Sequence, residues 1–330
     1  MNGVADEVLS LFSRARDAVW RPTPASMRLL ALFGVIGNAG IIATGGAVRV
    51  TESGLGCPEW PKCTGDSLVP THSPEHPAVN MAIEFGNRML TFLVLAIGLL
   101  VFVAALRLRP RRRDLLLLAA AQPLSVVAQA IIGGIVVLTE LHPTSVSLHF
   151  LVSPALLIFC VALWVRAGEG DAAPRALVGP AVRRIAQALV VATGAVLIAG
   201  TVVTGTGPHA GDADSRRYGF NIEDVTRVHS LLAWVTVALT VTLLAALHRT
   251  NAPRDVRRHT LELFGLELGQ GVLGYVQYFL GVPAPLVVLH MLCAALMWIA
   301  VLRVLLSTRD RGPLPVPAPT PTRTKAPQPA

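Results

Sequence analysis

The sequence contains one pattern twice: an apolar stretch, a short polar break, and a second apolar stretch that carries a histidine. The first copy reads QAIIGGIVVLTELHPTSVSLH, from Gln129 to His149, and the second runs from Gln270 to His290. In both copies the glutamine and the histidine lie 20 residues apart. A histidine inside a bilayer helix needs a polar partner that lipid does not supply, which makes it a candidate functional residue. The pattern therefore predicts two related helical units, each with such a histidine.

The repeated stretches belong to a chain that is too apolar for a soluble domain. Of its 330 residues 53% are hydrophobic and 15% charged, and the mean hydropathy is +0.58. These values are typical of a membrane protein. A bilayer is crossed by about 20 apolar residues in a helix. We therefore predict an all-α integral membrane protein with eight transmembrane helices, at roughly 27–48, 84–106, 115–138, 145–166, 182–204, 225–247, 259–280 and 286–307.

The distribution of Lys and Arg predicts the orientation, because cytoplasmic segments of membrane proteins carry an excess of these residues. With the N-terminus inside, 22 of the 28 basic residues fall in cytoplasmic segments. Both termini are therefore expected in the cytoplasm. The net charge of +8 is explained by membrane insertion, and nucleic acid is not expected as a partner. The other six basic residues are predicted on the outer face: Arg49, Lys62, Arg88, Arg216, Arg217 and Arg227.

The repeat divides the chain into two four-helix halves, predicted at 27–166 and 182–307. Each half contains an even number of spans, so both keep the same orientation and form two tandem bundles related by a parallel pseudo-two-fold repeat. The remaining segments are predicted to be a cytoplasmic N-terminal segment, a cytoplasmic linker and a disordered Pro-rich tail, at 1–26, 167–181 and 308–330.

The longest predicted outer loop carries the sequence CPEWPKC. Its cysteines, Cys57 and Cys63, face the oxidising side of the membrane, where a pair at this spacing can close a small disulfide. Two unrelated thiols are the alternative. A zinc site is less favoured, because the spacing matches no common zinc finger. The other two cysteines, Cys160 and Cys293, lie within spans and are expected to pack as small apolar residues.

A carboxylate stands at the outer boundary of the second span. Glu84 is followed one turn later by Asn87, with Arg88 next to it. An acid near a helix N-terminus is favoured by the helix dipole, so Glu84 is interpreted as a first-turn acid in one hypothesis. In the other, Glu84 and Asn87 face one cavity together, because residues three apart lie on one side of a helix.

Four polar residues near the outer ends of corresponding spans fall at about the same depth: Asn87, His149, His229 and His290. Two neutral imidazoles on facing helices can hold a haem through its iron, which makes His229 and His290 candidate axial ligands. An interhelical hydrogen bond is the alternative for a single histidine. At this depth the haem propionates would reach the outer arginines: Arg49, Arg88, Arg216, Arg217 and Arg227.

The other polar residues of the spans have simpler interpretations. Glu262 lies near the inner boundary and is expected in solvent. Glu267 lies deeper and must be paired or protonated, but the sequence indicates no partner. The remaining histidines are interpreted as surface residues: His142, His209, His248 and His259.

Taken together, these features resemble haem A synthase, the membrane enzyme that converts haem O to haem A for cytochrome oxidases. The resemblance covers roughly residues 27–307. It rests on the run TGGAVRVTESGLGCPEWPKC, on IEFGNR at the start of the second span, and on the histidines that open spans four, six and eight.

The resemblance implies a division of work between the halves. The C-terminal half would hold a haem b cofactor through the iron ligands His229 and His290, with Arg217 among the cofactor-binding residues. The N-terminal half would bind the substrate haem O, with His149 as ligand to its iron and Asn87 and Arg88 beside it.

The resemblance also implies roles in the outer loop and outside the protein. Glu84 would be the catalytic carboxylate, stabilising positive charge or moving protons as a porphyrin methyl group becomes a formyl group. Cys57 and Cys63 would form a disulfide that takes part in haem handling. The implied partners are haem O synthase, cytochrome c oxidase and membrane lipid, at a bacterial cell membrane with the active site near the outer face. Self-association is left open.

Asn87 departs from the family pattern, in which many members have histidine at this position. Asn is a poor iron ligand, so we expect single axial ligation of the substrate haem by His149. Two other classes remain as alternatives to the enzyme. One is a haem b electron-transfer cytochrome, which would need haems spaced across the bilayer. The other is a transporter with parallel repeats, which would need broken helices and midplane charges; Pro123 and Glu267 are the hints of these.

Overall fold

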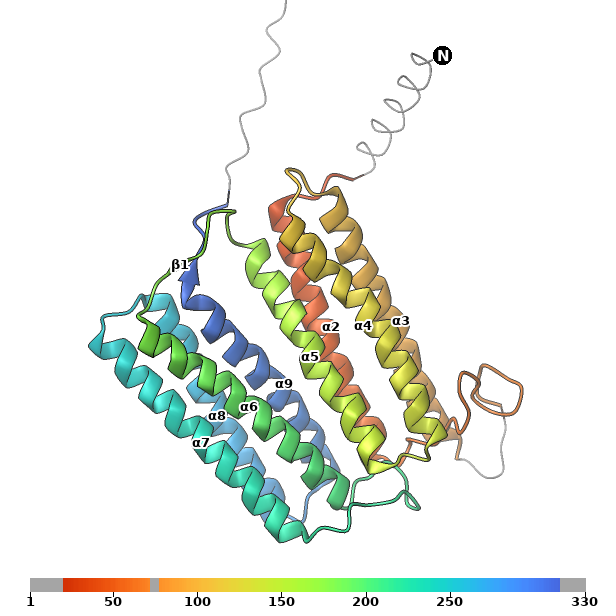
Figure 1. The fold of residues 1–330 in the computed structure, drawn as a ribbon. Coiled ribbons are helices and arrows are strands. Elements are labelled where there is room, and N and C mark those ends of the chain that lie inside the picture. The colour runs from red at the N-terminus through yellow and green to blue at the C-terminus, as the bar shows by residue number, and fades with distance from the viewer. Residues whose placement is uncertain (1–19, 72–76, 315–330) are drawn as a thin grey trace, which may run out of the picture.

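The structure is a computed structural model, and it describes residues 20–71 and 77–314. Within these ranges it contains eight long helices and two short strands (Figure 1). The helices are α2 (Pro24–Val50), α3 (Ala78–Arg107), α4 (Arg113–Leu138), α5 (Pro143–Ala167), α6 (Pro180–Thr206), α7 (Ile222–Arg249), α8 (Arg254–Phe279) and α9 (Ala284–Ser307). The strands are β1 (Arg175–Ala176) and β2 (Arg309–Asp310).

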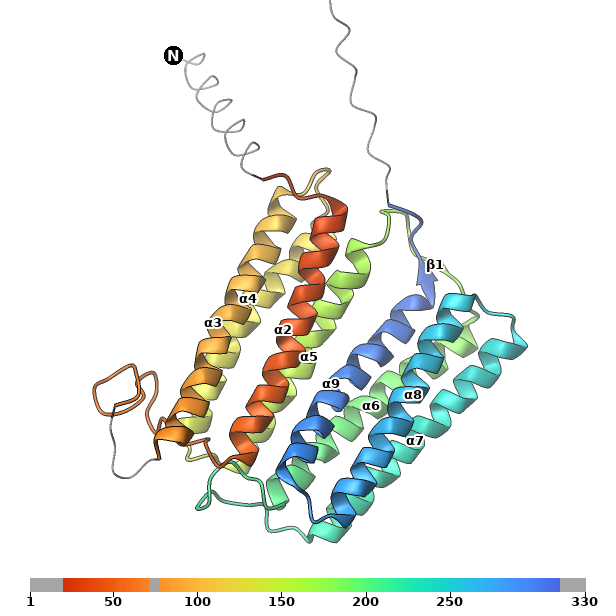
Figure 2. The same cartoon turned by 180° about the vertical axis from the view of Figure 1, so that it is seen from behind.

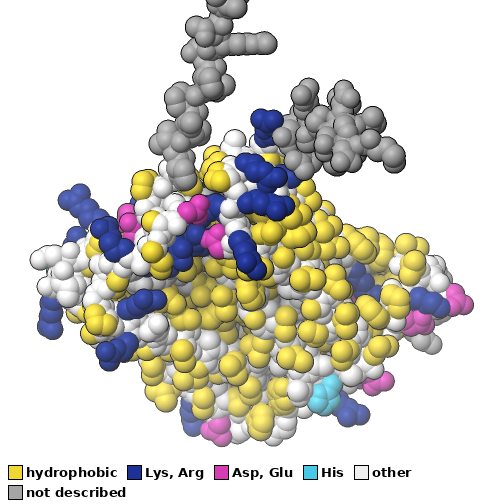
Figure 3. Space-filling view, turned by 45° about the horizontal axis from the view of Figure 1, so that its top comes forward, with side chains coloured by type: hydrophobic (Ala, Val, Ile, Leu, Met, Phe, Trp, Pro, Cys, Tyr) yellow, Lys and Arg dark blue, Asp and Glu magenta, His cyan; other side chains and the backbone are white. Residues whose placement is uncertain are grey.

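Seven of the eight helices are long and apolar enough to cross a membrane. On the face that Figure 3 shows, hydrophobic side chains cover much of the surface, and many of the Lys and Arg side chains lie towards the top of the view. The predicted all-α, multi-pass membrane protein is confirmed.

The exception among the eight is α8, which corresponds to the predicted span at 259–280. It is 26 residues long, yet it does not meet the same requirement for apolarity. Its sequence includes Glu262, Glu267 and Gln270. It nevertheless packs along α7 and α9, both of which are apolar spans.

The two copies of the repeated pattern share one turn geometry. In the turn between α4 and α5, Leu141 has a φ of 55°, and its N–H donates to the carbonyl of Val136 at 3.0 Å. In the turn between α8 and α9, Val282 has a φ of 61°, and its N–H donates to the carbonyl of Gln277 at 2.7 Å. This bond to a carbonyl five residues earlier belongs to the Schellman type of helix end. Each turn therefore starts the next helix in the same register relative to its histidine.

The arrangement of the helices brings α9 against α2 and α5. In both ribbon views α2 to α5 lie on one side and α6 to α9 on the other (Figures 1 and 2). Helix α9 contacts α2, α5, α6 and α8. One hydrophobic cluster runs through this junction and includes Leu157, Leu189 and Val301, all fully buried. The indole N–H of Trp298 on α9 donates to the carbonyl of Pro154 on α5 at 2.8 Å.

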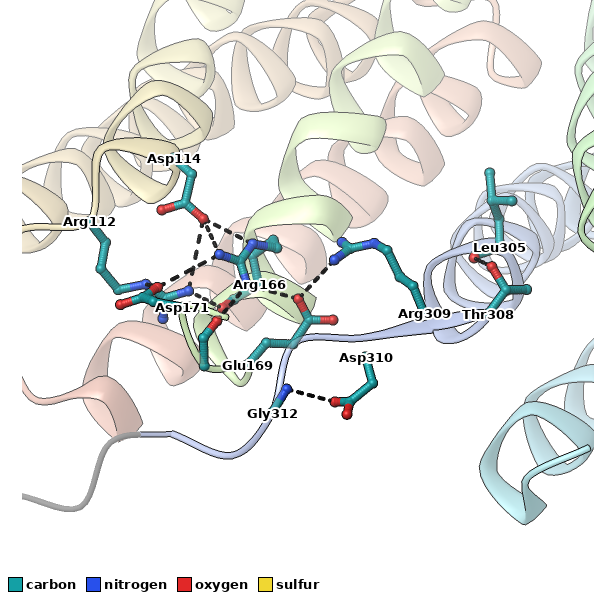
Figure 4. Close-up of polar contacts among 11 residues, drawn as sticks. Arg112, Asp114, Arg166, Glu169, Asp171, Leu305, Thr308, Arg309, Asp310 and Gly312 are labelled. Atoms are coloured by element: carbon teal, nitrogen blue, oxygen red, sulfur yellow. Dashed lines mark hydrogen bonds and ion pairs between the residues drawn. The ribbon is translucent and has the colours of Figure 1, made fainter. Parts of the chain in front are cut away.

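The end of the molecule at which α5 and α9 end is held by a cluster of charged side chains (Figure 4). The buried guanidinium of Arg166 on α5 pairs with Asp114 on α4 and, at 2.9 Å, with Glu169. Arg112 pairs with Asp171 at 2.7 Å. Arg309 reaches Glu169 from the segment after α9 at 3.3 Å. We call these residues the charged cluster; burial lowers the pKa of Arg112, against the opposing effect of Asp171.

The segment after α9 is partly ordered, which corrects one prediction. Strand β2 pairs antiparallel with β1, and the N–H of Gly170 donates to the carbonyl of Gly312 at 2.8 Å. The disordered tail predicted from 308 therefore begins too early. Residues 315–330, and most of the predicted N-terminal segment, lie outside the described residues.

Helix α3 also begins earlier than predicted, at Ala78 rather than near 84. Pro77 precedes it, and proline commonly marks a helix start. Glu84 therefore lies almost two turns inside the helix, and the interpretation as a first-turn acid is wrong.

Candidate functional site

His229 on α7 and His290 on α9 face each other near the end of the molecule at which both helices begin. Their ring centres are 6.4 Å apart and their planes differ by 56°. Each ring lies against a glycine of a neighbouring helix. A Cβ at Gly200 would meet Cε1 of His229 at 3.2 Å, and one at Gly274 would meet Cε1 of His290 at 3.4 Å. The two glycines therefore leave the space that the imidazoles occupy.

The distance between the two rings fits a metal held between them. An imidazole nitrogen binds a metal at about 2 Å, so two rings on opposite sides of one ion have centres roughly 6 Å apart. The Nδ1 atom of His229 lies 3.2 Å from the carbonyl of Val196. A proton on Nδ1 donates to this carbonyl and leaves Nε2 as the free ligand atom. The pair therefore fits an axially held haem iron.

His149 on α5 repeats the surroundings of His290. A Cβ at Gly133 of α4 would lie 3.3 Å from Cε1 of His149. Gly133 and Gly274 each follow the glutamine of the repeated pattern by four residues. Nδ1 of His149 is buried and has no hydrogen-bond partner among the described residues. A buried imidazole in this state is suited to bind a ligand that the protein alone does not supply.

Asn87 and Glu84 have different hydrogen-bond partners. Oδ1 of Asn87 accepts a hydrogen bond from the hydroxyl of Thr44 on α2 at 2.8 Å. Glu84 instead turns to the outer loop, so the structure does not bring these two predicted site residues together. The side chain of Asn87 is therefore held by α2. In the repeated sequence, Asn87 corresponds to His229 of the second half.

Glu84 is buried and binds the loop that carries the cysteine pair. Its carboxylate accepts a hydrogen bond from the backbone N–H of Cys57 at 2.6 Å. Cys57 and Cys63 are joined by a disulfide, with their Cα atoms 4.3 Å apart. Only 6% of Glu84 is exposed, so this carboxylate is kept from water by the loop it binds.

Arg88 completes the attachment of the loop. One side of its guanidinium donates to Glu84, at 3.1 Å from Nε and 2.5 Å from a terminal nitrogen. The remaining donors reach three backbone carbonyls of the loop, those of Cys57, Glu59 and Lys62, at 2.7, 3.1 and 2.9 Å. These contacts engage the five N–H donors of a guanidinium. Arg88 was predicted beside the substrate haem, and in the structure its donors are used within the protein.

Trp60, in the same loop, reaches the helix that carries Gly133. A Cβ at the neighbouring Gly134 would lie 2.5 Å from the Trp60 ring. The indole therefore packs directly on the backbone of α4, one residue from the glycine that contacts His149. The disulfide loop thus touches both Glu84 on α3 and the helix that faces His149.

The other outer arginines differ in what they contact. Arg49 donates to the carbonyls of Thr204 and His209, and Arg217 to those of Pro208 and Ser215. Arg227 pairs with Glu223 and Asp224 in solvent. Arg216 lines an open groove of about 640 Å³ together with Glu140, His142 and Ser145.

Sequence reasoning missed two contacts of buried polar residues. His209 was interpreted as a surface residue, but its Nε2–H donates to the carbonyl of Val282 at 2.8 Å, which holds the turn before His290. Glu267, for which no partner was predicted, accepts a hydrogen bond from the hydroxyl of Thr240 at 2.9 Å. A threonine inside an apolar span carries no distinctive signal, so only the fold identifies this partner.

Comparison with known families agrees with the geometry. The family model described as cytochrome oxidase assembly protein matches residues 28–302, most of the chain. The chain belongs to this family.

The family includes relatives with a named activity. The chain is 31% identical to a haem A synthase of Halalkalibacterium halodurans over 157 residues, which cover 46% of this chain and 51% of that protein. It is 37% identical to a haem A synthase of Lysinibacillus sphaericus over 131 residues, which cover 38% of this chain and 41% of that protein. The chain spans about half the length of the curated relatives it matches.

A further similarity involves a protein with a different name. The chain is 28% identical to a protohaem IX farnesyltransferase of Thermus thermophilus over 313 residues. The match covers 88% of this chain and 50% of that protein.

Proposed function

We propose that the protein is a haem A synthase, which oxidises a methyl group of haem O to a formyl group. The observation that carries the proposal is the His229–His290 pair, whose ring centres lie 6.4 Å apart in a chain of the cytochrome oxidase assembly family. The similarity to curated haem A synthases supports the same activity.

The two histidines would hold a haem b as a permanent cofactor, which supplies one-electron redox chemistry when bound. Gly200 and Gly274 leave room for the rings, and the Val196 carbonyl orients His229. Arg217 stays a candidate for the haem propionates, although its guanidinium also holds the carbonyls of Pro208 and Ser215.

The substrate haem would bind in the first half, with His149 as axial ligand to its iron. The unpartnered Nδ1 of His149 and the space at Gly133 support this assignment. Asn87 on α3, held by the Thr44 hydroxyl of α2, would leave the substrate iron without a second imidazole ligand. Arg88 would stay near the substrate as the anchor of the outer loop.

Glu84 would be the catalytic carboxylate. Converting a methyl group to a formyl group removes electrons and protons in equal number when water supplies the oxygen. A buried carboxylate near the substrate can accept such a proton or stabilise developing positive charge. The disulfide loop would exclude water from Glu84 and hold its carboxylate towards the outer face through the Cys57 N–H.

The surrounding membrane arrangement is part of the proposal. Both termini would lie in the cytoplasm of a bacterial cell, α8 would be the eighth span, and the active site would lie near the outer face. The basic side chains near the termini support this orientation. The halves 27–166 and 182–307 would act as two four-helix bundles, one for substrate and one for cofactor.

The proposed partners follow from the reaction. A haem O synthase would supply the farnesylated substrate, and a cytochrome c oxidase would receive the product. The similarity to a farnesyltransferase of protohaem over 88% of the chain supports a close connection between the two steps.

The proposal is tested by extracting haem from cells that make this protein together with a haem O synthase. We expect haem A with the wild type, identified by chromatography and mass, and its loss in Glu84→Gln, which keeps the size of the side chain. Glu262→Gln, the same change at an exposed acid near the other end of the helices, is the matched control and should keep the product. Haem b and unconverted haem O alone from the wild type would contradict the proposal and favour an electron-transfer cytochrome.

A further inference from the structure

Helix α8 carries a row of polar residues on one face. Glu267, Gln270, Gly274 and Gln277 follow one another at intervals of three or four residues, which places them on one side of a helix. Glu267 contacts Thr240 on α7, and the side-chain N–H of Gln270 donates to the carbonyl of His290 on α9 at 2.9 Å. These residues form the polar face of α8, which passes directly beside the candidate haem ligand His290.

The polar face of α8 contains buried acceptors that no described group satisfies. Oε2 of Glu267, Oε1 of Gln270 and Oε1 of Gln277 are all buried and lack a hydrogen-bond partner within residues 20–71 and 77–314. Buried polar atoms in proteins nearly always have a partner, and ordered water supplies it where protein groups do not. The three residues span ten positions, or about 15 Å of helix. A file of water molecules along this face would satisfy all three.

The first half of the chain shows that the fold does not require these residues. The spacing of 141 residues that relates His149 to His290 also relates Val126 to Glu267 and Val136 to Gln277. Both valines are buried. The carboxyl group of Glu267 and the amide of Gln277 therefore distinguish the half that contains the histidine pair from the first half.

Glu267 forms no ion pair with any group in residues 20–71 and 77–314. Only 4% of the residue is exposed, and its carboxylate accepts a hydrogen bond from the Thr240 hydroxyl. Away from the helix ends, the titratable side chains on the two helices packed against α8 are His229 on α7, and His290 and Cys293 on α9. A carboxylate at this depth is costly unless a positive charge is near or a proton is bound. Its charge state must therefore follow a neighbour whose charge changes.

We propose that the polar face of α8 is a hydrated proton path and that Glu267 is its proton carrier. The inference rests on the proposed function in one respect, the haem held by His229 and His290. Glu267 would be ionised while a ferric haem is held by His229 and His290, because its carboxylate would then have one net positive charge nearby. On one-electron reduction of that haem the carboxylate would bind one proton through waters beside Gln270 and Gln277. On reoxidation Glu267 would release the proton by the same path.

The function of this path is to balance the electrons that the oxidation of the methyl group releases. Each electron that passes through the histidine pair is accompanied by one proton on Glu267, so no uncompensated charge remains inside the membrane. Gln277 lies two residues before the end of α8, at the end of the molecule where α9 begins, so the path would open there. Glu267 is a proton carrier and does not contact the reacting methyl group.

The test uses the full-length protein with its haem, reduced and reoxidised at an electrode while infrared difference spectra are recorded. In the wild type we expect the carbonyl band of a protonated carboxylic acid to appear on reduction, and the midpoint potential to fall as pH rises. Glu267→Gln and Glu267→Val, the second matching Val126, should lose the band and the pH dependence. Glu262→Gln, an exposed acid on the same helix, is the matched control and should keep both.

The outcomes separate this inference from the proposed function, because haem A is measured in the same cells. A band or a pH-dependent potential that persists in Glu267→Gln overturns the proton carrier, even if haem A is made. If the band and the pH dependence of the potential require Glu267 but the cells make no haem A, the role of Glu267 as proton carrier is supported and the proposed haem A synthase activity is contradicted. Purified wild-type protein without haem at the histidine pair overturns both. Gln277→Leu should keep the carbonyl band. After transfer to heavy water, the shift of this band, which reports exchange of the Glu267 proton, should be slower than in the wild type. An unchanged rate of exchange contradicts the path.

Discussion

The carboxylate of Glu84 accepts a hydrogen bond from the backbone N–H of Cys57, at a distance of 2.6 Å. The proposed catalytic carboxylate is thus attached to the disulfide loop, and Arg88 holds both from the side. A change in the loop therefore alters the surroundings of the carboxylate. The first prediction concerns this attachment.

Replacing Arg88 by Lys should loosen the disulfide loop. An ammonium group cannot reproduce the planar set of five donors that joins Glu84 to three loop carbonyls. If the free energy that holds the loop against Glu84 falls by about 1.4 kcal/mol, the population of the released loop rises about tenfold. We therefore expect thiol reagents to reduce the Cys57–Cys63 disulfide at least about ten times faster. Arg227→Lys, in an exposed ion pair, should leave the rate unchanged. Equal rates in wild type and Arg88→Lys would show that the guanidinium does not hold the loop.

Adding a methyl group next to a candidate ligand should rotate its ring. A Cβ at Gly200 would lie 3.2 Å from Cε1 of His229, a distance at which the ring must shift. In Gly200→Ala we expect a changed electron paramagnetic resonance spectrum of the bound ferric haem, because the spectrum depends on the orientation of the axial imidazoles. At Gly269 no heavy atom lies within 4 Å of an added Cβ, so Gly269→Ala is the control. Identical spectra for all three proteins would place the haem elsewhere.

The second axial position of the substrate haem should respond to a change at Asn87. We expect the wild type, loaded with haem O, to contain a high-spin ferric component, because in the proposed site His149 would be the single protein ligand of that haem. The double variant Asn87→His with Thr44→Ala removes the hydroxyl that holds Asn87 and supplies a second imidazole. Its haem O should become low-spin in optical spectra, whereas Thr44→Ala alone should not change the spin state. Wholly low-spin haem in the loaded wild type would rule out single ligation.

The charged cluster should contribute to stability through Arg166. Its buried guanidinium faces Asp114, Glu169 and Asp171, so Arg166→Leu leaves these carboxylates without their central partner. Removing one partner of a buried pair costs about 3–5 kcal/mol. Two of these acids are more than one-third exposed, which reduces the expected loss to about 1–2 kcal/mol.

The measurement is thermal unfolding in detergent, with Arg175→Leu as control, since its ion pair with Asp310 at the same end is exposed. We expect a lower melting temperature for Arg166→Leu alone. Equal melting temperatures in the two variants would mean that the cluster adds nothing beyond a surface ion pair.

The sequence predicted the helices well where apolar length decides the structure. Seven predicted spans coincide with helices that are apolar enough to cross a membrane. The repeated glutamine, glycine and histidine pattern also located the histidines, because the shared turn at Leu141 and Val282 gives both copies one register. The start of α3 was missed because Glu84 was placed at the outer boundary of the span, although residues 78–83 before it include Asn80 as their one polar side chain.

The contacts between distant segments could not be predicted in the same way. The partner of Glu84 is a backbone N–H 27 residues away, and no side-chain pattern indicates a backbone donor. The pairing of β1 with β2 involves four residues without a strand-like alternation. Arg88, four residues after Glu84, was the one local signal, since an acid and a base at this spacing share a helix face.

The most direct test of the whole account is to compare the haem retained by purified His229→Ala, His290→Ala and His149→Ala proteins, each made together with a haem O synthase. We predict that His229→Ala and His290→Ala lose haem b, whereas His149→Ala keeps haem b and loses bound haem O and the formation of haem A. His142→Ala, at the start of the same helix as His149, should behave as the wild type. Retention of haem b after loss of either His229 or His290, with normal formation of haem A, would contradict the account.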